Sequence, residues 1–196
     1  MSELIINIAA VEEQSLIYGP GVRYVIWTQG CSIHCPGCWN KDMWSFKPKK
    51  LITVSDLCSQ ILALQTQIEG ITILGGEPFD QYRPVLELVK CIRQKSDLSI
   101  ILYTGYEVEQ LKTKNQTEVF DYIDILIAGP YRQELRTMNG GLIGSTNQQI
   151  IFLTDRYSED DLPQTNEIEI NIESDGSLTI LGYPDDELIN KIFSTS

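Results

Sequence analysis

Short apolar runs alternate along most of the chain with longer segments in which apolar residues recur at helical spacing. Runs of the length expected for strands occur at residues 4–9, 22–29, 70–74, 98–103 and 123–127. Helical segments are predicted over residues 54–68, 80–95 and 107–120. Short, largely apolar runs such as GITIL and IDILI are typical of parallel strands covered on both faces. We therefore expect an α/β fold with βα units, a parallel sheet and helices packed outside it.

The pattern changes near the end of the chain. Residues 149–153 are predicted as a strand and 155–165 as an acidic loop. Residues 167–173 alternate strictly between isoleucine and polar side chains, and a turn at 175–176 precedes a second apolar alternation. This arrangement predicts a β-hairpin. A last amphipathic helix is expected to begin at Pro184.

Size and charge narrow the class of protein. The chain has 196 residues, of which 42% are hydrophobic and 21% charged, and we expect one domain over residues 1–196. Its core would span about 1–153, with a C-terminal extension over about 154–196.

The formal charge of −12 argues against a broad nucleic-acid surface, which requires Lys and Arg. No apolar run approaches the roughly 18 residues that span a bilayer, and the N-terminus lacks the basic start of a secretory signal. We expect a cytoplasmic protein.

Three of the five cysteines fall in one loop, predicted over residues 30–50. Cys31, Cys35 and Cys38 form a C-x3-C-x2-C pattern, and their thiolates would suit an iron–sulfur cluster or zinc. Structural zinc usually takes four protein ligands, yet the sequence holds no second C-x2-C or H-x3-H pair, and His34 is poorly placed beside Cys35. Three thiolates would hold three irons of a cubane and leave the fourth open to a substrate. The pattern favours a [4Fe–4S] cluster, with zinc as the alternative.

The remaining cysteines and two aromatic residues have less specific interpretations. Cys58 and Cys91 lie on the apolar faces of predicted helices, and we expect both to be buried free thiols. Trp44 and Phe46 follow the cysteine loop and are expected either to pack over it or to line a groove for a partner.

Two further turns come directly after predicted strands. One is the Gly-Gly-Glu-Pro turn at residues 75–78, where adjacent glycines would let the backbone approach a ligand closely. The other is the Tyr-Thr-Gly-Tyr turn at residues 103–106. Because the carboxyl ends of parallel strands meet at one rim, both turns should converge with the cysteine loop. Taken alone, each is also compatible with an ordinary turn.

The cysteine pattern placed after a strand resembles the radical S-adenosylmethionine superfamily. A wider set of residues resembles the glycyl-radical-enzyme activases, in particular those of anaerobic ribonucleotide reductases. These residues are Gly19-Pro20-Gly21-Val22-Arg23, Gln29-Gly30-Cys31 and Cys35-Pro36-Gly37-Cys38-Trp39-Asn40. The similarity extends from about residue 15 to about 152.

This resemblance implies the cofactors and their ligands. A [4Fe–4S] cluster would be bound by Cys31, Cys35 and Cys38. The contacts implied for S-adenosylmethionine are Gly37, Trp39, Gly75, Gly76, Glu77, Pro78 and Thr104. Many superfamily members carry an aromatic residue immediately before the third cysteine, where this chain has Gly37.

Two other segments compare with the family less closely. Ser145 and Asn147 lie in a Gly-Ser-x-Asn-Gln segment that the family shares, and we expect them near the cofactor or a partner. Ala128 stands where reductase activases commonly carry Asp, although Asp124 remains on the strand.

The resemblance also implies the chemistry and the fold. The reduced cluster would cleave S-adenosylmethionine to methionine and a 5′-deoxyadenosyl radical, which abstracts hydrogen from a glycine of a partner such as anaerobic ribonucleotide reductase. No catalytic acid or base is expected, and the electron donor would be of the flavodoxin or ferredoxin type. The fold would be an incomplete (β/α) barrel, extended by the hairpin and the last helix. The alternatives are a small radical enzyme that modifies a peptide or metabolite, and a non-catalytic zinc or iron–sulfur binding module.

Overall fold

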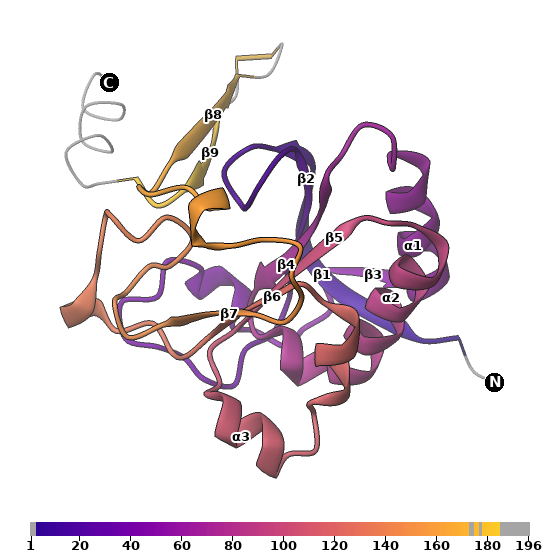
Figure 1. Cartoon of the computed structure of the whole chain (residues 1–196), viewed down its shortest axis with the longest axis horizontal. Helices are drawn as coiled ribbons and strands as arrows, with labels where there is room; N and C mark the ends of the chain where they lie inside the picture. Colours follow the sequence, from indigo (N-terminus) through magenta and orange to yellow (C-terminus); the bar gives the residue numbers. More distant parts are fainter. Residues whose placement is uncertain (1–2, 173–174, 177, 185–196) are drawn as a thin grey trace.

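A seven-stranded sheet with the order β3-β1-β2-β4-β5-β6-β7 forms the centre of the protein, in a computed structural model that describes residues 3–172, 175–176 and 178–184 (Figure 1). Neighbouring strands among β2, β4, β5 and β6 are parallel, whereas β1, β3 and β7 pair with their neighbours in antiparallel fashion. The strands are β1 (Ile5–Ser15), β2 (Arg23–Thr28), β3 (Lys50–Thr53), β4 (Gly70–Gly75), β5 (Ser99–Thr104), β6 (Ile125–Ala128) and β7 (Gln149–Phe152).

The fold is mixed α/β with a mostly parallel central sheet, and the expected incomplete barrel is not confirmed. Within the described residues, β3 and β7 are the two open edges of the sheet. β1 and β2 are antiparallel because residues 16–22 between them are fewer than the roughly dozen that a parallel crossover needs. The edge strand β3 begins at the last residue of the predicted loop and ends just before the predicted helix, and the apolar pattern did not indicate it.

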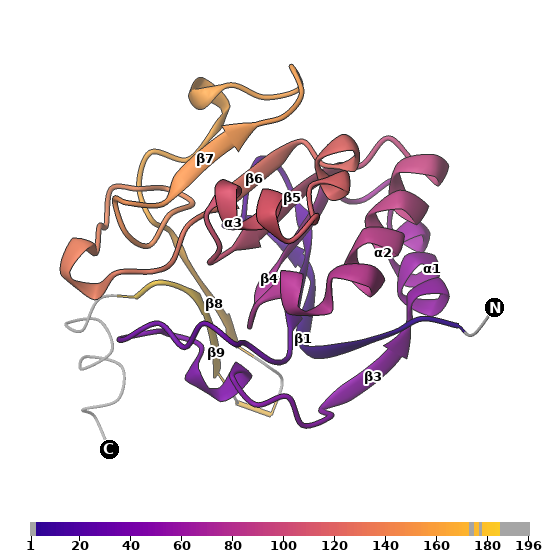
Figure 2. The same cartoon turned by 90° about the horizontal axis from the view of Figure 1, so that it is seen from below.

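In the part of the chain that is described, three α-helices cover one face of the sheet, and α1 and α2 lie side by side there (Figure 2). They are α1 (Val54–Ala63), α2 (Tyr82–Lys95) and α3 (Val108–Thr113). Thr53 caps α1, since its hydroxyl accepts a hydrogen bond from the Asp56 N–H at 3.0 Å. α1 and α3 are shorter than predicted; α3 is followed by a separate 3₁₀ turn (Glu118–Tyr122). Alternate strand residues, such as Ile26, Ile73 and Leu102, pack beneath the helices.

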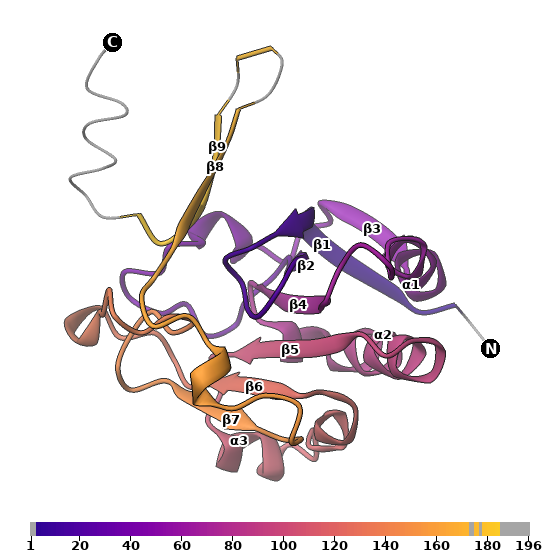
Figure 3. The same ribbon diagram turned by 45° about the horizontal axis from the view of Figure 1, so that its top comes forward.

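The other face of the sheet is covered by the C-terminal part of the chain. Ile101, Ile125 and Ile127 pack there against Leu142 and Leu162. The predicted hairpin is confirmed as β8 (Ile168–Ile172) and β9 (Leu178–Gly182), on the side away from α1 and α2 (Figure 3). The predicted last helix after Pro184 falls outside the described residues. In the part of the chain that is described, no helix is both long enough and apolar enough to cross a membrane.

Cys58 and Cys91 form a disulfide between α1 and α2, so the expectation of two free thiols was wrong. Their Cα atoms lie 6.5 Å apart, within the range that a disulfide requires. Each residue was correctly assigned to an apolar helix face. Helical periodicity does not reveal that two such faces, 33 residues apart in sequence, meet each other.

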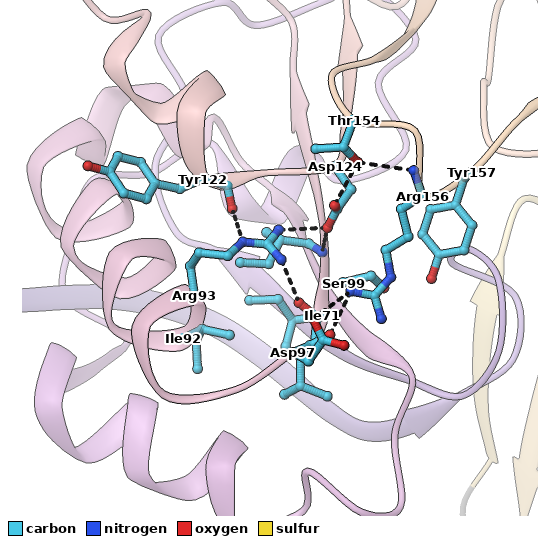
Figure 4. A network of polar contacts seen from close by, with 12 residues as sticks. Ile71, Ile92, Arg93, Asp97, Ser99, Tyr122, Asp124, Thr154, Arg156 and Tyr157 are labelled. Atoms are coloured by element: carbon cyan, nitrogen blue, oxygen red, sulfur yellow. Dashed lines mark hydrogen bonds and ion pairs between the residues drawn. The ribbon is translucent and has the colours of Figure 1, made fainter.

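Two buried polar residues tie the strands together away from the cysteine loop. Arg23 is fully buried and donates hydrogen bonds to the Thr72 and Ser99 hydroxyls, among other acceptors. Burial lowers its pKa to about 10, so the guanidinium stays charged at neutral pH. Asp124 is also buried and accepts hydrogen bonds from Arg93 and Thr154 (Figure 4). Both residues therefore stabilise the sheet rather than contribute to the cysteine site.

Candidate functional site

The cysteine loop leaves the carboxyl end of β2 and is held there by backbone hydrogen bonds. The Gly30 N–H donates to the Met43 carbonyl at 2.8 Å, and the Cys31 N–H donates to the Trp44 carbonyl at 3.1 Å. Trp44 also stacks on His34, with ring centroids 4.6 Å apart. The end of the loop thus folds back over its beginning, which fixes Cys31 relative to the sheet.

All three cysteines of the loop are free thiols and line one cavity of about 390 Å³. Burial raises the pKa of both Cys31 and Cys35, so these thiols are protonated at neutral pH until a metal displaces the protons. Among the described residues, no three His, Cys, Asp or Glu side chains surround a single point as one metal ion would require. A [4Fe–4S] cluster has no such requirement, since each thiolate binds a different iron. Three free thiols on one cavity wall fit that donor set.

The cavity also contains every residue that the sequence predicted to contact S-adenosylmethionine. These are Gly37, Trp39, Gly75, Gly76, Glu77, Pro78 and Thr104. They come from the ends of β2, β4 and β5, which lie next to one another in the sheet. The predicted convergence of three loops at one rim is therefore observed, while the contacts themselves stay predictions.

The glycines of the Gly-Gly-Glu-Pro turn allow it to pack against the cysteine loop. A Cβ atom on Gly76 would lie 2.2 Å from the Gly30 carbonyl oxygen, and Gly75 has a φ of +109°. The Gly76 N–H donates to the Thr28 carbonyl, and the Glu77 N–H donates to the Gly30 carbonyl, each at 2.8 Å. Position 76 must be glycine because a Cβ atom would prevent this close backbone contact. The same lack of a side chain would also let a ligand approach the turn closely.

Glu77 connects the turns that follow β4 and β5. Its side chain is 1% exposed and accepts hydrogen bonds from the Phe79 N–H, the Thr104 hydroxyl and the Gly105 N–H. Burial raises the pKa of Glu77 to about 7, although these three donors act in the opposite direction. Glu77 and Thr104 therefore position each other, a role that their place in the sequence motifs did not reveal.

Glu77→Gln is expected to flatten the pH dependence of stability between about pH 5 and 7. The folded carboxyl has a pKa of about 7 against 4.5 for a solvent-exposed glutamate, so the folded state binds the extra proton in this window. Stability therefore falls as pH rises, by at most about 1.4 kcal/mol per pH unit. Glutamine does not titrate and should remove this contribution, which urea unfolding of the cluster-free protein would measure.

The matched control is Glu109→Gln, because Glu109 is an exposed carboxylate that pairs with Lys112 on the same helix. This variant should keep the wild-type dependence of stability on pH. An unchanged slope in Glu77→Gln would contradict the assignment of the raised pKa to this carboxyl.

Asp80 is a further positioning residue that the sequence did not indicate. It accepts hydrogen bonds from the Ser32 N–H at 2.6 Å, the Ser32 hydroxyl at 2.9 Å and the Tyr106 hydroxyl at 3.1 Å. One carboxylate thus joins the cysteine loop to the turns after β4 and β5. Its partners are 48 and 26 residues away in sequence, so no local pattern marks the cluster.

Ser145 and Asn147 support the loop after β6 and do not line the cavity. The buried Ser145 hydroxyl accepts from the Arg132 N–H, and the Asn147 amide donates to the Pro130 carbonyl.

The two aromatic residues after the cysteines lie in different surroundings. Trp44 packs over the cysteine loop, which was one of the two expectations. Phe46 lies against Gly30, and its side chain is 57% exposed.

Comparison with known proteins gives one family and several relatives. Residues 17–151 match the family described as a 4Fe-4S single cluster domain. The anaerobic ribonucleoside-triphosphate reductase-activating protein of Enterobacteria phage T4 is 34% identical over 145 residues, which cover 71% of this chain and 89% of that protein. Its counterpart from Escherichia coli K12 is 30% identical over 70% of this chain and 93% of its own length. The pyruvate formate-lyase-activating enzyme of Staphylococcus epidermidis is 37% identical over 41% of this chain and 34% of that enzyme.

Proposed function

The chain belongs to the 4Fe-4S single-cluster family of radical S-adenosylmethionine activases, and on this premise we propose that it installs a glycyl radical on a partner of the anaerobic ribonucleotide reductase type. Its cofactors are a [4Fe–4S] cluster and S-adenosylmethionine. The observation that carries the proposal is the meeting of three free cysteines with the turns after β4 and β5 in one cavity.

Cys31, Cys35 and Cys38 would each hold one iron of the cluster. The cofactors, when bound, supply the electron transfer and the 5′-deoxyadenosyl radical that removes a hydrogen atom from the glycine. The chain's own task is to position these groups and to exclude water. Glu77 serves that task by fixing the turns after β4 and β5, and Asp80 by tying the cysteine loop to them.

The relatives by name activate anaerobic ribonucleoside-triphosphate reductase or pyruvate formate-lyase. A large glycyl-radical enzyme is therefore the proposed partner, with a flavodoxin- or ferredoxin-type protein as the electron donor. The reductase is favoured over the lyase because the reductase activators match along most of their own length.

Anaerobic reconstitution with iron and sulfide, followed by reduction in the presence of S-adenosylmethionine, tests the proposal. We expect 5′-deoxyadenosine and, with a candidate reductase, a stable glycyl radical in the electron paramagnetic resonance spectrum. Retention of zinc without 5′-deoxyadenosine would support a non-catalytic module. Cofactor cleavage that never yields a glycyl radical would favour an enzyme that modifies a peptide or metabolite.

A further inference from the structure

The hairpin formed by β8 and β9 lies beyond the segment that matches the family, yet it reaches the cavity of the cysteine loop. The family match ends at residue 151, whereas β9 ends at Gly182 and the next residue, Tyr183, lines the cavity. Tyr183 therefore lines the same cavity as the third cysteine of the loop, Cys38.

Contacts on both sides of Tyr183 hold it in this place. The Gly182 N–H donates to the Tyr18 hydroxyl at 2.9 Å, and Leu181 packs on the cluster that contains Tyr18. On the other side, the Arg136 guanidinium donates to the Pro184 carbonyl at 3.1 Å. Gly182 has a φ of +90°, which favours glycine at the point where the chain turns from β9 towards the cavity.

The hairpin itself is tied to the end of β1. The Ser15 hydroxyl donates to the Glu169 carboxylate at 2.8 Å, and Ser15 is buried. The position of Tyr183 therefore depends on contacts with β1, with Tyr18 and with the loop after β6.

The cysteine loop offers no ring of its own at the position before Cys38. Gly37 has a φ of +72°, and a Cβ atom there would lie 2.4 Å from the Gln133 side-chain oxygen. No larger side chain fits this position without displacing Gln133. Trp39, which follows Cys38, is 45% exposed at the edge of the cavity.

Tyr183 is the best placed of the three tyrosines that line the cavity. The Tyr103 hydroxyl donates to the Leu142 carbonyl, and its ring packs within the apolar clusters of the sheet face. The Tyr131 ring lies against Gly144, where a Cβ atom would approach it to 3.3 Å. Tyr183 also lines the cavity, and it comes from the end of β9 rather than from the sheet or the loop after β6.

We propose that Tyr183 supplies the aromatic surface on which the adenine of S-adenosylmethionine packs, in place of a ring before Cys38. The inference rests on the proposed function, since it takes S-adenosylmethionine as the ligand of this cavity. The C-terminal hairpin then acts as a structural part of the cofactor site.

Titration calorimetry on the reconstituted full-length protein tests this role, with S-adenosylmethionine and L-methionine as separate probes. Tyr183→Ala is expected to raise the Kd for S-adenosylmethionine about tenfold, as the loss of one base–aromatic stack does. The Kd for methionine, which has no adenine, should stay within about twofold of wild type. Tyr183→Phe should bind both probes normally, and Tyr183→Leu, which keeps apolar bulk without a ring, should behave like the alanine variant.

Ile172→Ala is the matched control, because Ile172 is on the same hairpin but is 74% exposed. It should bind both probes as wild type does. Unchanged S-adenosylmethionine binding in Tyr183→Ala and Tyr183→Leu would overturn the proposal, as would equal weakening of both probes. A wild-type protein that holds a cluster but neither binds nor cleaves S-adenosylmethionine would overturn the proposed function as well, so the two failures are distinguishable.

Discussion

Cys35→Ala is expected to abolish the [4Fe–4S] cluster and to reduce 5′-deoxyadenosine formation more than about 100-fold. The physical reason is the ligand count: with two thiolates left, one more iron of the cubane loses its protein ligand. Because Cys35 is only partly buried and its neighbours Pro36 and Gly37 are unchanged, the fold itself should persist. Iron and sulfide content, the absorbance near 400 nm and product formation after anaerobic reconstitution measure the effect.

Cys91→Ala is the matched control, since it removes a cysteine that the structure places in a disulfide far from the cavity lining. It should retain full cluster content and product formation, while the cross-link between α1 and α2 is lost. A Cys35→Ala protein that assembles a normal cluster would show that the loop is not the ligand set. Equal loss of the cluster in Cys91→Ala would point to a general folding defect instead.

Asp124→Ala is expected to lower the free energy of unfolding by about 3 kcal/mol, because it removes a partly buried ion pair and leaves two further hydrogen-bond donors without their buried acceptor. Asp124 is 3% exposed and accepts from Arg93 at 2.7 Å, the Ile100 N–H at 2.8 Å and the Thr154 hydroxyl at 2.9 Å (Figure 4). These donors belong to α2, β5 and the segment after β7. Urea unfolding of the cluster-free protein, monitored by circular dichroism, measures the change.

Asp97→Ala provides the comparison, because its fully exposed carboxylate reaches Arg156 only at 3.7 Å. Exposed pairs of this kind contribute little, and we expect no measurable change in the free energy of unfolding. If Asp124→Ala were no less stable than Asp97→Ala, the network in Figure 4 would not hold the sheet edge together.

The predicted helices and strands agree with the structure where burial is complete and fail where it is partial. β4, β5 and β6 are almost entirely buried, and continuous apolar runs marked each of them. β3 is half exposed and only four residues long, so its periodicity was too weak to separate it from the cysteine loop. The end of α1 was placed too late because Leu64 and Ile68 continue its apolar face after the helix has stopped.

The candidate site divides in the same way between local and long-range features. Spacing identified the three cysteines, and strand-end turns identified Glu77 and Thr104, because each of these signals lies within a few adjacent residues. Asp80 and Tyr183 carried no such signal. Asp80 acts on residues from two other loops, and Tyr183 follows an exposed hairpin that is remote in sequence from the cavity it lines.

By itself, the sequence determined the order of the buried strands and helices, the confirmed β8–β9 hairpin and the grouping of three cysteines in one loop, since each depends on neighbours along the chain. Only the tertiary structure decided that the sheet is open, that Cys58 and Cys91 are bonded and that Tyr183 enters the cavity. These features depend on which distant segments pack together. The burial of apolar faces and the pairing of buried polar groups across the whole sheet determine which segments pack together. These contacts join residues that are far apart in sequence, so no local pattern encodes them.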